Sequence, residues 1–304
     1  MPDPENNEAN DCESTETSNE KAGLASRRSQ TFSAWQAPVG VAAGTWDYVN
    51  RDHIGDQYDS FVEREPLNYV DRKIISRYLP SLKNLARSSA SGQQPPGPAV
   101  IDFGCGTGRT LLPLVKDGYR AVGVDLSESM LANLKKKLLK HDLEEASVSM
   151  ILANLVELSC LADQTADHGV CMLSTLGMIK EDKNRAKFLA HARRIIRPDG
   201  RFFVHAHNYF YQWRHPGGIR WAAVNLVRSL QGKEEVGDRL ATYRNVSGMF
   251  IHQFRRSELS QSLTDAGFPS QEWFGVEAGS TEPVPIKGWH NPFRFVGWVV
   301  VGQS

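Results

Sequence analysis

The stretch Val100-Ile-Asp-Phe-Gly-Cys-Gly-Thr-Gly-Arg-Thr110 decides the fold of this chain. Its first four residues form a short apolar run interrupted by one carboxylate, Asp102, which is typical of a buried parallel strand. Glycine tolerates positive φ and close backbone approach, so the alternating glycines predict a tight turn beneath a ligand. Apolar residues then recur at helical spacing from Leu111 to Gly118, a natural helix stop. The stretch therefore predicts a strand, a glycine turn and a helix.

The segment after Gly118 predicts the second half of a nucleotide-binding βαβ unit. Tyr119–Val124 has the pattern of a second strand, and Asp125 follows at its tip, 21 residues after Gly104. An acidic residue about 20 positions after the first glycine is the usual acceptor for ribose hydroxyls. Ser127 then caps a helix whose leucines share one face. The pattern predicts a ribose-bearing ligand at the two strand tips.

The residues of the turn indicate which nucleotide-like ligand is expected. The dinucleotide fingerprint is G-x-G-x-x-G, whereas Gly108 comes one position too early for it. Asp102 lies just before the turn, where its charge disfavours a pyrophosphate, and the absence of a Lys-Ser or Lys-Thr pair excludes a P-loop. S-adenosylmethionine fits better, because it combines a ribose with a sulfonium, an ammonium and one carboxylate and has no phosphate.

Asp102-Phe-Gly-Cys-Gly-Thr-Gly108, followed by Val122-Gly-Val-Asp-Leu-Ser127, resembles motif I and its successor in class I S-adenosylmethionine-dependent methyltransferases. The resemblance extends from about residue 98 to the C-terminus. It implies an α/β fold: a Rossmann-like, doubly wound, seven-stranded, mostly parallel sheet with a reversed last strand. It also implies cofactor-binding positions, which are Tyr58, Asp102, Gly104, Cys105, Gly106, Asp125, Leu126, Asn154, Leu155 and Leu173.

The resemblance assigns a role to several of these positions. Asp102 shapes the turn and faces the ammonium side of the ligand through water, while the glycines let the backbone approach its amino-acid part. Asp125 accepts the ribose hydroxyls, and Asn154 and Leu155 meet the adenine. The family usually has Asp where this chain has Asn154, but an amide oxygen accepts the same hydrogen bond. The alternative is that Asn154 only shapes a turn.

Composition divides the chain into three parts. Residues 1–34 are polar and predict a disordered tail, because they cannot bury enough apolar surface to offset their ordering entropy. Residues 35–90 carry spread aromatic residues in a partly helical pattern and predict an N-terminal helical cap. The low-complexity linker Arg87–Pro98 separates this cap from the cofactor-binding core at 91–304.

An insert at 207–254 follows the fifth strand of the predicted core. It is rich in aromatic and cationic residues, and connections of this length usually carry structure and function of their own. We expect a helix at Ile219–Leu230 and a hairpin or two strands around Gly248. The insert predicts a lid or a substrate wall, with an oligomer surface or a membrane-surface helix as alternatives.

Residues near the strand tips are candidates for the acceptor site, because ligands of open α/β sheets bind beyond the carboxyl ends of the strands. The predicted substrate-binding residues are Trp46, Thr175, Tyr211 and Trp213. If a general base is needed, we expect His207 to supply it, with His205 as second choice. The alternatives are aromatic packing, a Thr175 hydroxyl bonded to backbone, and histidines that are simply polar residues at a sheet edge. No metal is expected, since no third ligand lies at useful spacing.

Composition limits the class of function. Lys and Arg number 35 and Asp and Glu also number 35, so no global field favours nucleic acid. The four cysteines show no metal-ligand spacing, and no signal peptide or stable membrane insertion is expected, which predicts a cytoplasmic protein. We expect a methyltransferase acting on a small molecule by in-line methyl transfer. The alternatives are a methyltransferase-like cofactor-binding protein without turnover, a nicotinamide-dependent oxidoreductase and a nucleic-acid methyltransferase.

Overall fold

The predicted first strand is β1 (Ala99–Phe103), and all five of its residues are buried. The computed structural model describes residues 37–50, 66–83, 97–141, 143, 147–243, 246–288 and 290–304. Val100 and Ile101 enter different core clusters, because successive side chains of a strand point to opposite faces of the sheet. β1 is therefore covered on both faces, as its mostly apolar character predicts.

β1 lies inside an eight-stranded sheet of order β3-β2-β1-β4-β5-β10-β8-β9. The five strands β3, β2, β1, β4 and β5 are parallel to one another, whereas β10 is antiparallel to both β5 and β8. This confirms the doubly wound, mostly parallel sheet with a reversed last strand, and β9 adds a short edge strand. The remaining strands are β2 (Arg120–Asp125), β3 (Val148–Leu152), β4 (His168–Cys171), β5 (Arg201–His207), β8 (Ser270–Val276), β9 (Val284–Ile286) and β10 (Gly297–Gln303).

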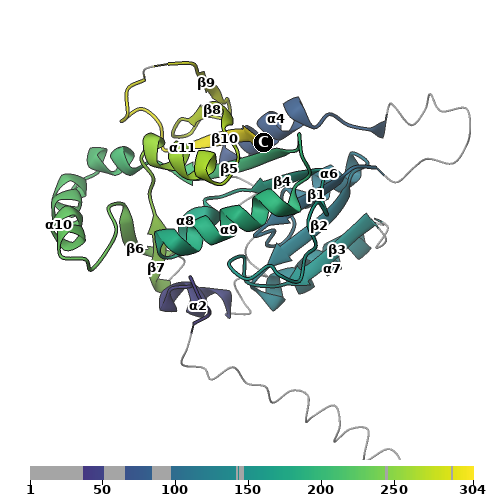
Figure 1. Ribbon diagram of the computed structural model, residues 1–304, viewed down its shortest axis with the longest axis horizontal. Helices are drawn as coiled ribbons and strands as arrows, with labels where there is room; N and C mark the ends of the chain where they lie inside the picture. The colour runs from purple at the N-terminus through teal and green to yellow at the C-terminus, as the bar shows by residue number, and fades with distance from the viewer. Residues whose placement is uncertain are drawn as a thin grey trace, which may run out of the picture. The chain divides into compact units, whose positions relative to one another are not determined.

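Helices cover both faces of this sheet (Figure 1). On one face α6 and α7 pack on β2 and β3, while on the other α9 and α11 pack against Phe103 and Phe202. The strand order turns back between β1 and β4, so the carboxyl ends of these strands form the switch point where ligands bind in such sheets. The helices are α6 (Leu111–Lys116), α7 (Glu128–Lys140), α8 (Thr175–Met178), α9 (Asp182–Ile195) and α11 (Arg256–Asp265).

The helix α4 (Pro66–Tyr78) packs directly on the large sheet. Its Val70 and Ile74 are buried in the cluster that contains Val100 and Phe203. The sequence predicted that the helices of residues 35–90 form a cap before the core. In the structure α4 is part of the helical layer on the sheet, and it covers the portion of that face that α6 and α7 leave open. The boundaries 35–90 and 91–304 remain predictions, and the tail at 1–34 lies outside the described residues.

The insert after β5 contains its own helices and strands. They are the 3-10 helix η3 (Tyr209–Arg214), α10 (Gly218–Leu230), β6 (Asp238–Tyr243) and β7 (Val246–His252). The predicted helix at Ile219–Leu230 is confirmed as α10. The predicted hairpin also exists as an antiparallel pair separate from the large sheet, but Gly248 lies within β7 and not at the turn.

The helix α2 (Ala43–Val49) connects this insert to the tip of β2. On the insert side, the Phe250 backbone N–H donates to the Thr45 hydroxyl at 3.3 Å. On the sheet side, the Ser127 hydroxyl donates to the Val49 carbonyl oxygen at 3.0 Å. Tyr48 is buried in a small cluster with residues of β7 and α7. α2 therefore spans from the insert to the strand tip where a ribose is expected.

We predict that Gly44→Ala loosens α2 from β7. A Cβ at Gly44 would lie 2.2 Å from the Gly248 carbonyl oxygen, so the helix must shift. Overpacking of this kind costs about 1–3 kcal/mol, which exceeds the roughly 1 kcal/mol that alanine gains over glycine in a helix. Thermal unfolding should show a melting temperature lower by several degrees, on the scale of about 2–4 °C per kcal/mol.

The matched control is Gly288→Ala, because a Cβ at Gly288 meets nothing within 4 Å. This control should unfold at the same temperature as the original chain. If Gly44→Ala also does so, α2 does not pack closely on β7 in solution.

Candidate functional site

The glycine turn is held to the tip of β2 by backbone hydrogen bonds. The N–H groups of Gly104 and Cys105 both donate to the Val124 carbonyl oxygen, at 2.8 and 3.0 Å. The Gly106 N–H donates to Asp125 Oδ2 at 2.7 Å. The Asp125 carboxylate is thus joined to the turn, which brings these predicted residues together at one end of the sheet.

Asp125 is a half-buried acid whose ionised form the backbone supports. Burial raises the pKa of its carboxyl, and backbone N–H donors, Ser127 and Gly106 foremost, act in the opposite direction. Its Oδ1 accepts the Ser127 N–H at 2.9 Å. A carboxylate offers about four lone-pair positions, so Asp125 can still accept a hydroxyl group beside its backbone donors Ser127, Gly106 and Leu126. The Cys105 side chain lies in the core, where its Sγ is 2.9 Å from a Cβ built on Gly123, so only its backbone can serve a ligand.

Asp102 is 3% exposed, and burial raises the pKa of its carboxyl to about 7 although Arg109 lowers it. The guanidinium of Arg109 donates to Asn68 Oδ1 at 2.6 Å and to Asp71 Oδ2 at 2.9 Å. Arg109 is therefore committed to α4, and the Asp102 carboxylate accepts no hydrogen bond from the described residues. A positively charged ligand group next to Asp102 would stabilise its ionised form.

Asn68, Asp71 and Arg109 are site neighbours that the sequence analysis missed. Burial raises the pKa of Asp71 to about 6 in spite of its pairing with Arg109. Within the described part of the chain, Asp71 Oδ1 is buried without a hydrogen-bond partner. The available signal was an acid at position 71 between the apolar residues Val70 and Ile74, on the buried stripe of a predicted helix.

The tip of β4 contacts the glycine turn directly. Leu173 and Ser174 both adopt positive φ, at 51° and 61°, and such backbone strain clusters at functional sites. The Thr175 hydroxyl donates to the Met172 carbonyl oxygen at 2.8 Å, and its methyl carbon would be 2.6 Å from a Cβ on Gly104. Thr175 therefore packs the β4 tip on the turn, and its hydroxyl has a backbone partner, as the alternative interpretation held.

Two histidines extend the site to the tip of β5. The His207 N–H donates to the Ser174 hydroxyl oxygen at 3.3 Å, and the rings of His205 and His207 lie 5.3 Å apart. Burial lowers the pKa of His207 to about 4. Burial, His207 and Arg109 hold the pKa of His205 well below its usual range, and neither ring nitrogen of His205 has a partner among the described residues. Both imidazoles are thus neutral at physiological pH.

Asn154 follows β3 and holds a turn. Its Oδ1 accepts the Val156 N–H at 3.1 Å, and its side-chain amide donates to the Val39 carbonyl oxygen at 2.9 Å. The turn-shaping alternative is therefore present in the structure, and adenine contacts by Asn154 and Leu155 remain predictions. Leu126 lies directly after Asp125, at the same strand tip.

The predicted aromatic residues are spread over α2 and η3. Trp46 is half-buried on α2, whereas the Tyr211 ring lies 5.3 Å from the His215 ring. Trp213 packs in an aromatic cluster, with its ring 6.0 Å from those of Tyr209 and Phe293. Trp213 therefore packs η3 against Phe293, which lies outside the insert, and its contact with a substrate stays a prediction. Tyr58 lies outside the described residues.

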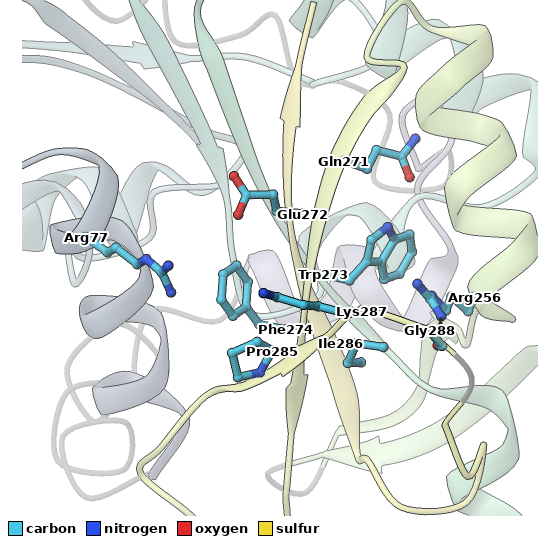
Figure 2. Close-up of a pocket in the computed structure, with 10 residues that line it drawn as sticks. All are labelled: Arg77, Arg256, Gln271, Glu272, Trp273, Phe274, Pro285, Ile286, Lys287 and Gly288. Carbon is cyan, nitrogen blue, oxygen red and sulfur yellow. Dashed lines mark hydrogen bonds between the residues drawn. The ribbon is translucent and has the colours of Figure 1, made fainter.

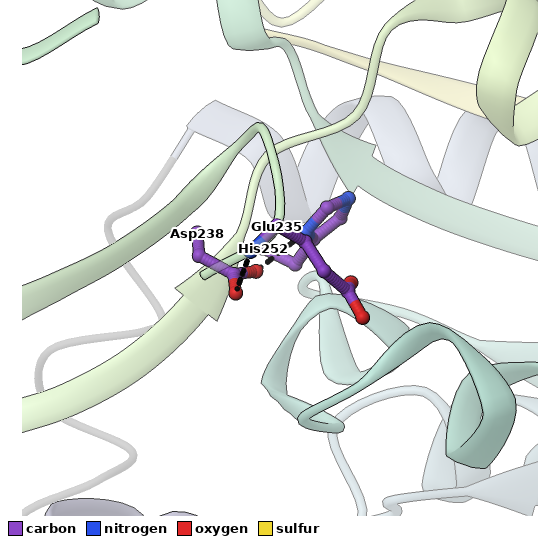
Figure 3. A group of neighbouring side chains, drawn as sticks. All are labelled: Glu235, Asp238 and His252. Carbon is purple, nitrogen blue, oxygen red and sulfur yellow. Dashed lines mark hydrogen bonds and ion pairs between the residues drawn. The ribbon is translucent and has the colours of Figure 1, made fainter. Parts of the chain in front are cut away.

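A cluster of acids around His252 joins the insert to the core (Figure 3). His252 is fully buried, with Nδ1 2.8 Å from Asp238 Oδ1 and Nε2 2.7 Å from Glu258 Oε1. Burial alone would lower the pKa of His252, but these two carboxylates raise it overall. Glu235 accepts from Arg185 and from the Asp182 N–H. Because these polar atoms already have partners, we interpret the cluster as a structural latch between β6, β7 and α11.

A pocket of about 510 Å³ lies elsewhere, at the β8–β9 edge of the sheet (Figure 2). Its lining includes the cationic residues Arg77, Arg256 and Lys287. The Arg256 guanidinium carbon lies 5.1 Å from the centre of the Trp273 ring, and this side chain donates to the Gly288 carbonyl oxygen. A proline in a short edge strand and a lysine beside it are devices that keep a sheet edge from pairing with other chains. This pocket is separate from the strand tips that form the candidate site.

The comparisons with known proteins agree with this arrangement. A family model described as a methyltransferase domain matches residues 100–200, which contain the glycine turn, Asp125 and the β4 tip. A protein of Geobacillus sp. (strain WCH70) that is named as a methyltransferase is 25% identical over 213 residues. This match covers 61% of the present chain and 78% of that relative.

Solved structures share the fold. A SAM-dependent methyltransferase from Methanosarcina mazei aligns with a TM-score of 0.52 and 18% identity, covering 69% of this chain and 94% of that one. An S-adenosylmethionine-dependent methyltransferase from Clostridium acetobutylicum ATCC 824 aligns with a TM-score of 0.52 and 12% identity, covering 83% and 98%. Among the described helices, none combines the length and apolar character of a membrane span.

We predict that the latch makes stability depend on pH. The folded-state pKa of His252 is raised above 6.5, so its contribution is complete below the unfolded pKa and is lost as pH rises through the folded pKa. The melting temperature of the original chain should therefore fall above about pH 7 relative to that of His252→Gln, which has no proton to lose. His141→Gln, at the exposed end of α7, is the control and should follow the original chain. Parallel curves for all three proteins would contradict a charged His252.

Proposed function

The chain belongs to the class I S-adenosylmethionine-dependent methyltransferases, and we propose that it methylates a small-molecule acceptor held at the tips of β4 and β5. Its cofactor is S-adenosylmethionine. The observation that carries the proposal is the convergence of three strand tips. The Gly106–Asp125 hydrogen bond, the packing of Thr175 on Gly104 and the Ser174–His207 hydrogen bond join them at one end of the sheet.

The charges at this end of the sheet fit the cofactor. Asp102 is buried without a hydrogen-bond donor among the described residues, and Arg109 is occupied by Asp71. An ammonium or sulfonium is favourable there, whereas a pyrophosphate would lack a cation and meet a carboxylate. We assign the ribose hydroxyls to Asp125, and the backbone of Gly104 and Gly106 to the amino-acid part of the cofactor.

We assign the flanking apolar residues to the rest of the cofactor. Leu126 and Leu155 follow β2 and β3, where they would border the adenine with Asn154, and Leu173 would border the methyl end. α2 reaches from β7 to Ser127, so it lies beside the predicted ribose site, and we assign Trp46 to the acceptor side. We favour a small acceptor over a nucleic acid, because the balanced charge of the chain offers a nucleic acid no attraction.

S-adenosylmethionine supplies, when bound, a methyl group on a sulfonium that an in-line nucleophile displaces. The chain then has to orient the nucleophile and exclude water. With a pKa of about 4, His207 is a weak base but a good hydrogen-bond acceptor at neutral pH. We therefore assign His207 to holding the N–H or O–H of the acceptor, and the proton leaves to solvent. Tyr211 and Trp213 lie in η3, and we propose that Tyr211 borders the acceptor.

We predict that Asp125→Ala weakens cofactor binding. Charge-assisted hydrogen bonds contribute about 1.5–3 kcal/mol, so the dissociation constant of S-adenosylhomocysteine should rise by about 10- to 100-fold. Isothermal titration calorimetry would measure it, with NAD titrated in parallel and expected not to bind.

The matched control is Asp167→Ala. Asp167 Oδ2 accepts the Ala99 N–H at 2.7 Å, so this acid also supports β1, but at the opposite end of the strand. The control should lose stability and retain cofactor affinity. An Asp125→Ala variant that binds S-adenosylhomocysteine normally would place the cofactor elsewhere, and tight NAD binding would favour the oxidoreductase alternative.

We predict that His207→Ala lowers kcat without changing the shape of the pH profile. Loss of one orienting hydrogen bond should reduce kcat by about tenfold or more, since misorientation is costly in displacement reactions. The assay measures S-adenosylhomocysteine formed with panels of amines, phenols and carboxylic acids between pH 5 and 9. A rate that rises near pH 6.5 only when His207 is present would identify it as a general base. Cofactor binding without turnover on any acceptor would favour the cofactor-binding protein.

A further inference from the structure

The outward face of α10 exposes an unusual number of large aliphatic side chains. Their exposed fractions are 66% for Ile219, 49% for Val224, 50% for Leu226, 53% for Val227 and 81% for Leu230. Contiguous apolar surface of this kind marks an interaction site in a protein that folds on its own. Figure 1 shows α10 beyond the helices that flank the large sheet.

The orientation of α10 is fixed by its opposite face. Gly218, Ala222 and Asn225 are buried, and the Asn225 amide donates to the Glu235 carbonyl oxygen at 3.0 Å and accepts the Gly237 N–H at 2.8 Å. The Trp221 ring packs 5.5 Å from that of Tyr209. The helix cannot rotate its aliphatic side chains inward without breaking these buried contacts.

The spacing of the exposed residues predicts a helix as the partner. Ile219, Ala223, Leu226 and Leu230 are separated by four, three and four positions, which is the alternation of a helix–helix seam. Ala223 is also exposed, and a small residue in the middle of a seam allows a facing helix to come close.

We propose that α10 is a self-association surface and pairs antiparallel with α10 of a second copy of this chain. A two-fold axis between Val224 and Asn225 places Ile219 against Leu230 of the second copy and Ala223 against its Leu226. Each copy then makes the same contacts, as an isologous interface requires. The small Ala223 faces a large leucine, so the two seams fill each other.

The charges favour a second copy over a lipid surface. In the antiparallel pair Arg220 faces Ser229 of the second copy, so it meets no like charge directly. Arg228 is paired with Glu234 at 2.9 Å. A helix that lies on a membrane needs free cations beside its apolar face, whereas the Arg228 guanidinium on α10 is engaged by Glu234.

The size of the surface sets the strength of the association. Stable interfaces use roughly 20–30 residues on each side, and a 13-residue helix offers fewer even with Leu240, which is 66% exposed on β6. The dimer is therefore in equilibrium with the monomer, and its population rises with protein concentration.

Sedimentation velocity of the full chain between about 1 and 100 µM tests the proposal over the range of weak dimers. The original chain should shift from monomer to dimer across this range. Leu226→Glu and Ala223→Glu place a charge at the seam of each copy and should weaken the dimer at least tenfold. Leu139→Glu is the matched control, because Leu139 is 62% exposed on α7, and it should associate like the original chain.

Each of the other outcomes overturns the proposal. A chain that stays monomeric to about 100 µM has no self-association of this strength. If Leu139→Glu weakens the dimer as much as Leu226→Glu does, the interface lies elsewhere. The same conclusion follows if neither Leu226→Glu nor Ala223→Glu weakens the dimer. A monomeric chain that floats with phosphatidylcholine–phosphatidylglycerol vesicles, and loses this in Leu226→Glu, identifies lipid as the occupant. Calorimetry with S-adenosylhomocysteine should give the same affinity for all variants, which separates this test from that of the proposed function.

Discussion

The hydrogen bond from the Gly106 N–H to Asp125 Oδ2, 2.7 Å long, is the constraint on which the rest of the site depends. It fixes the glycine turn against the tip of the neighbouring strand, where the sequence predicts that a ribose binds. A turn in this conformation leaves no room for side chains: a Cβ on Gly104 would meet Thr175, and one on Gly108 would meet Leu134. The carboxylate that shapes the turn is therefore the same one that the sequence predicts as the ribose acceptor.

A second polar contact ties the outer layer to the same turn. Arg109 follows the last glycine and is held by Asn68 and Asp71 of α4, a helix otherwise attached through Val70 and Ile74. Because Arg109 is paired with Asp71, the nearest cation is not free to meet a ligand. Asp102 then determines the charge of the predicted ligand site. The histidines at the β5 tip are neutral for a different reason, because desolvation lowers the pKa of both imidazoles.

How much of this was predictable depends on the range of the interactions. The turn, Asp125 and the parallel strands follow from spacing within about 25 residues, where chain geometry dictates the outcome. The pairing of Asp71 with Arg109 joins residues 38 positions apart, and the contact of α2 with β7 joins residues 205 apart. No local pattern encodes these contacts. Asn154 shows a further limit, because its amide can serve a turn or a ligand and sequence does not distinguish the two.

The insert is organised as one unit with two distinct surfaces. Asp238 bonds to His252 and also accepts the Glu235 N–H at 2.9 Å, while Asn225 attaches α10 to the same loop. β7 carries the contact with α2 near the strand tips, whereas the aliphatic seam of α10 points away from the buried side of this unit. Because polar contacts hold the unit together from within, its outer seam can change without altering the surface that meets α2. The insert can thus associate with other molecules independently of the chemistry at the strand tips.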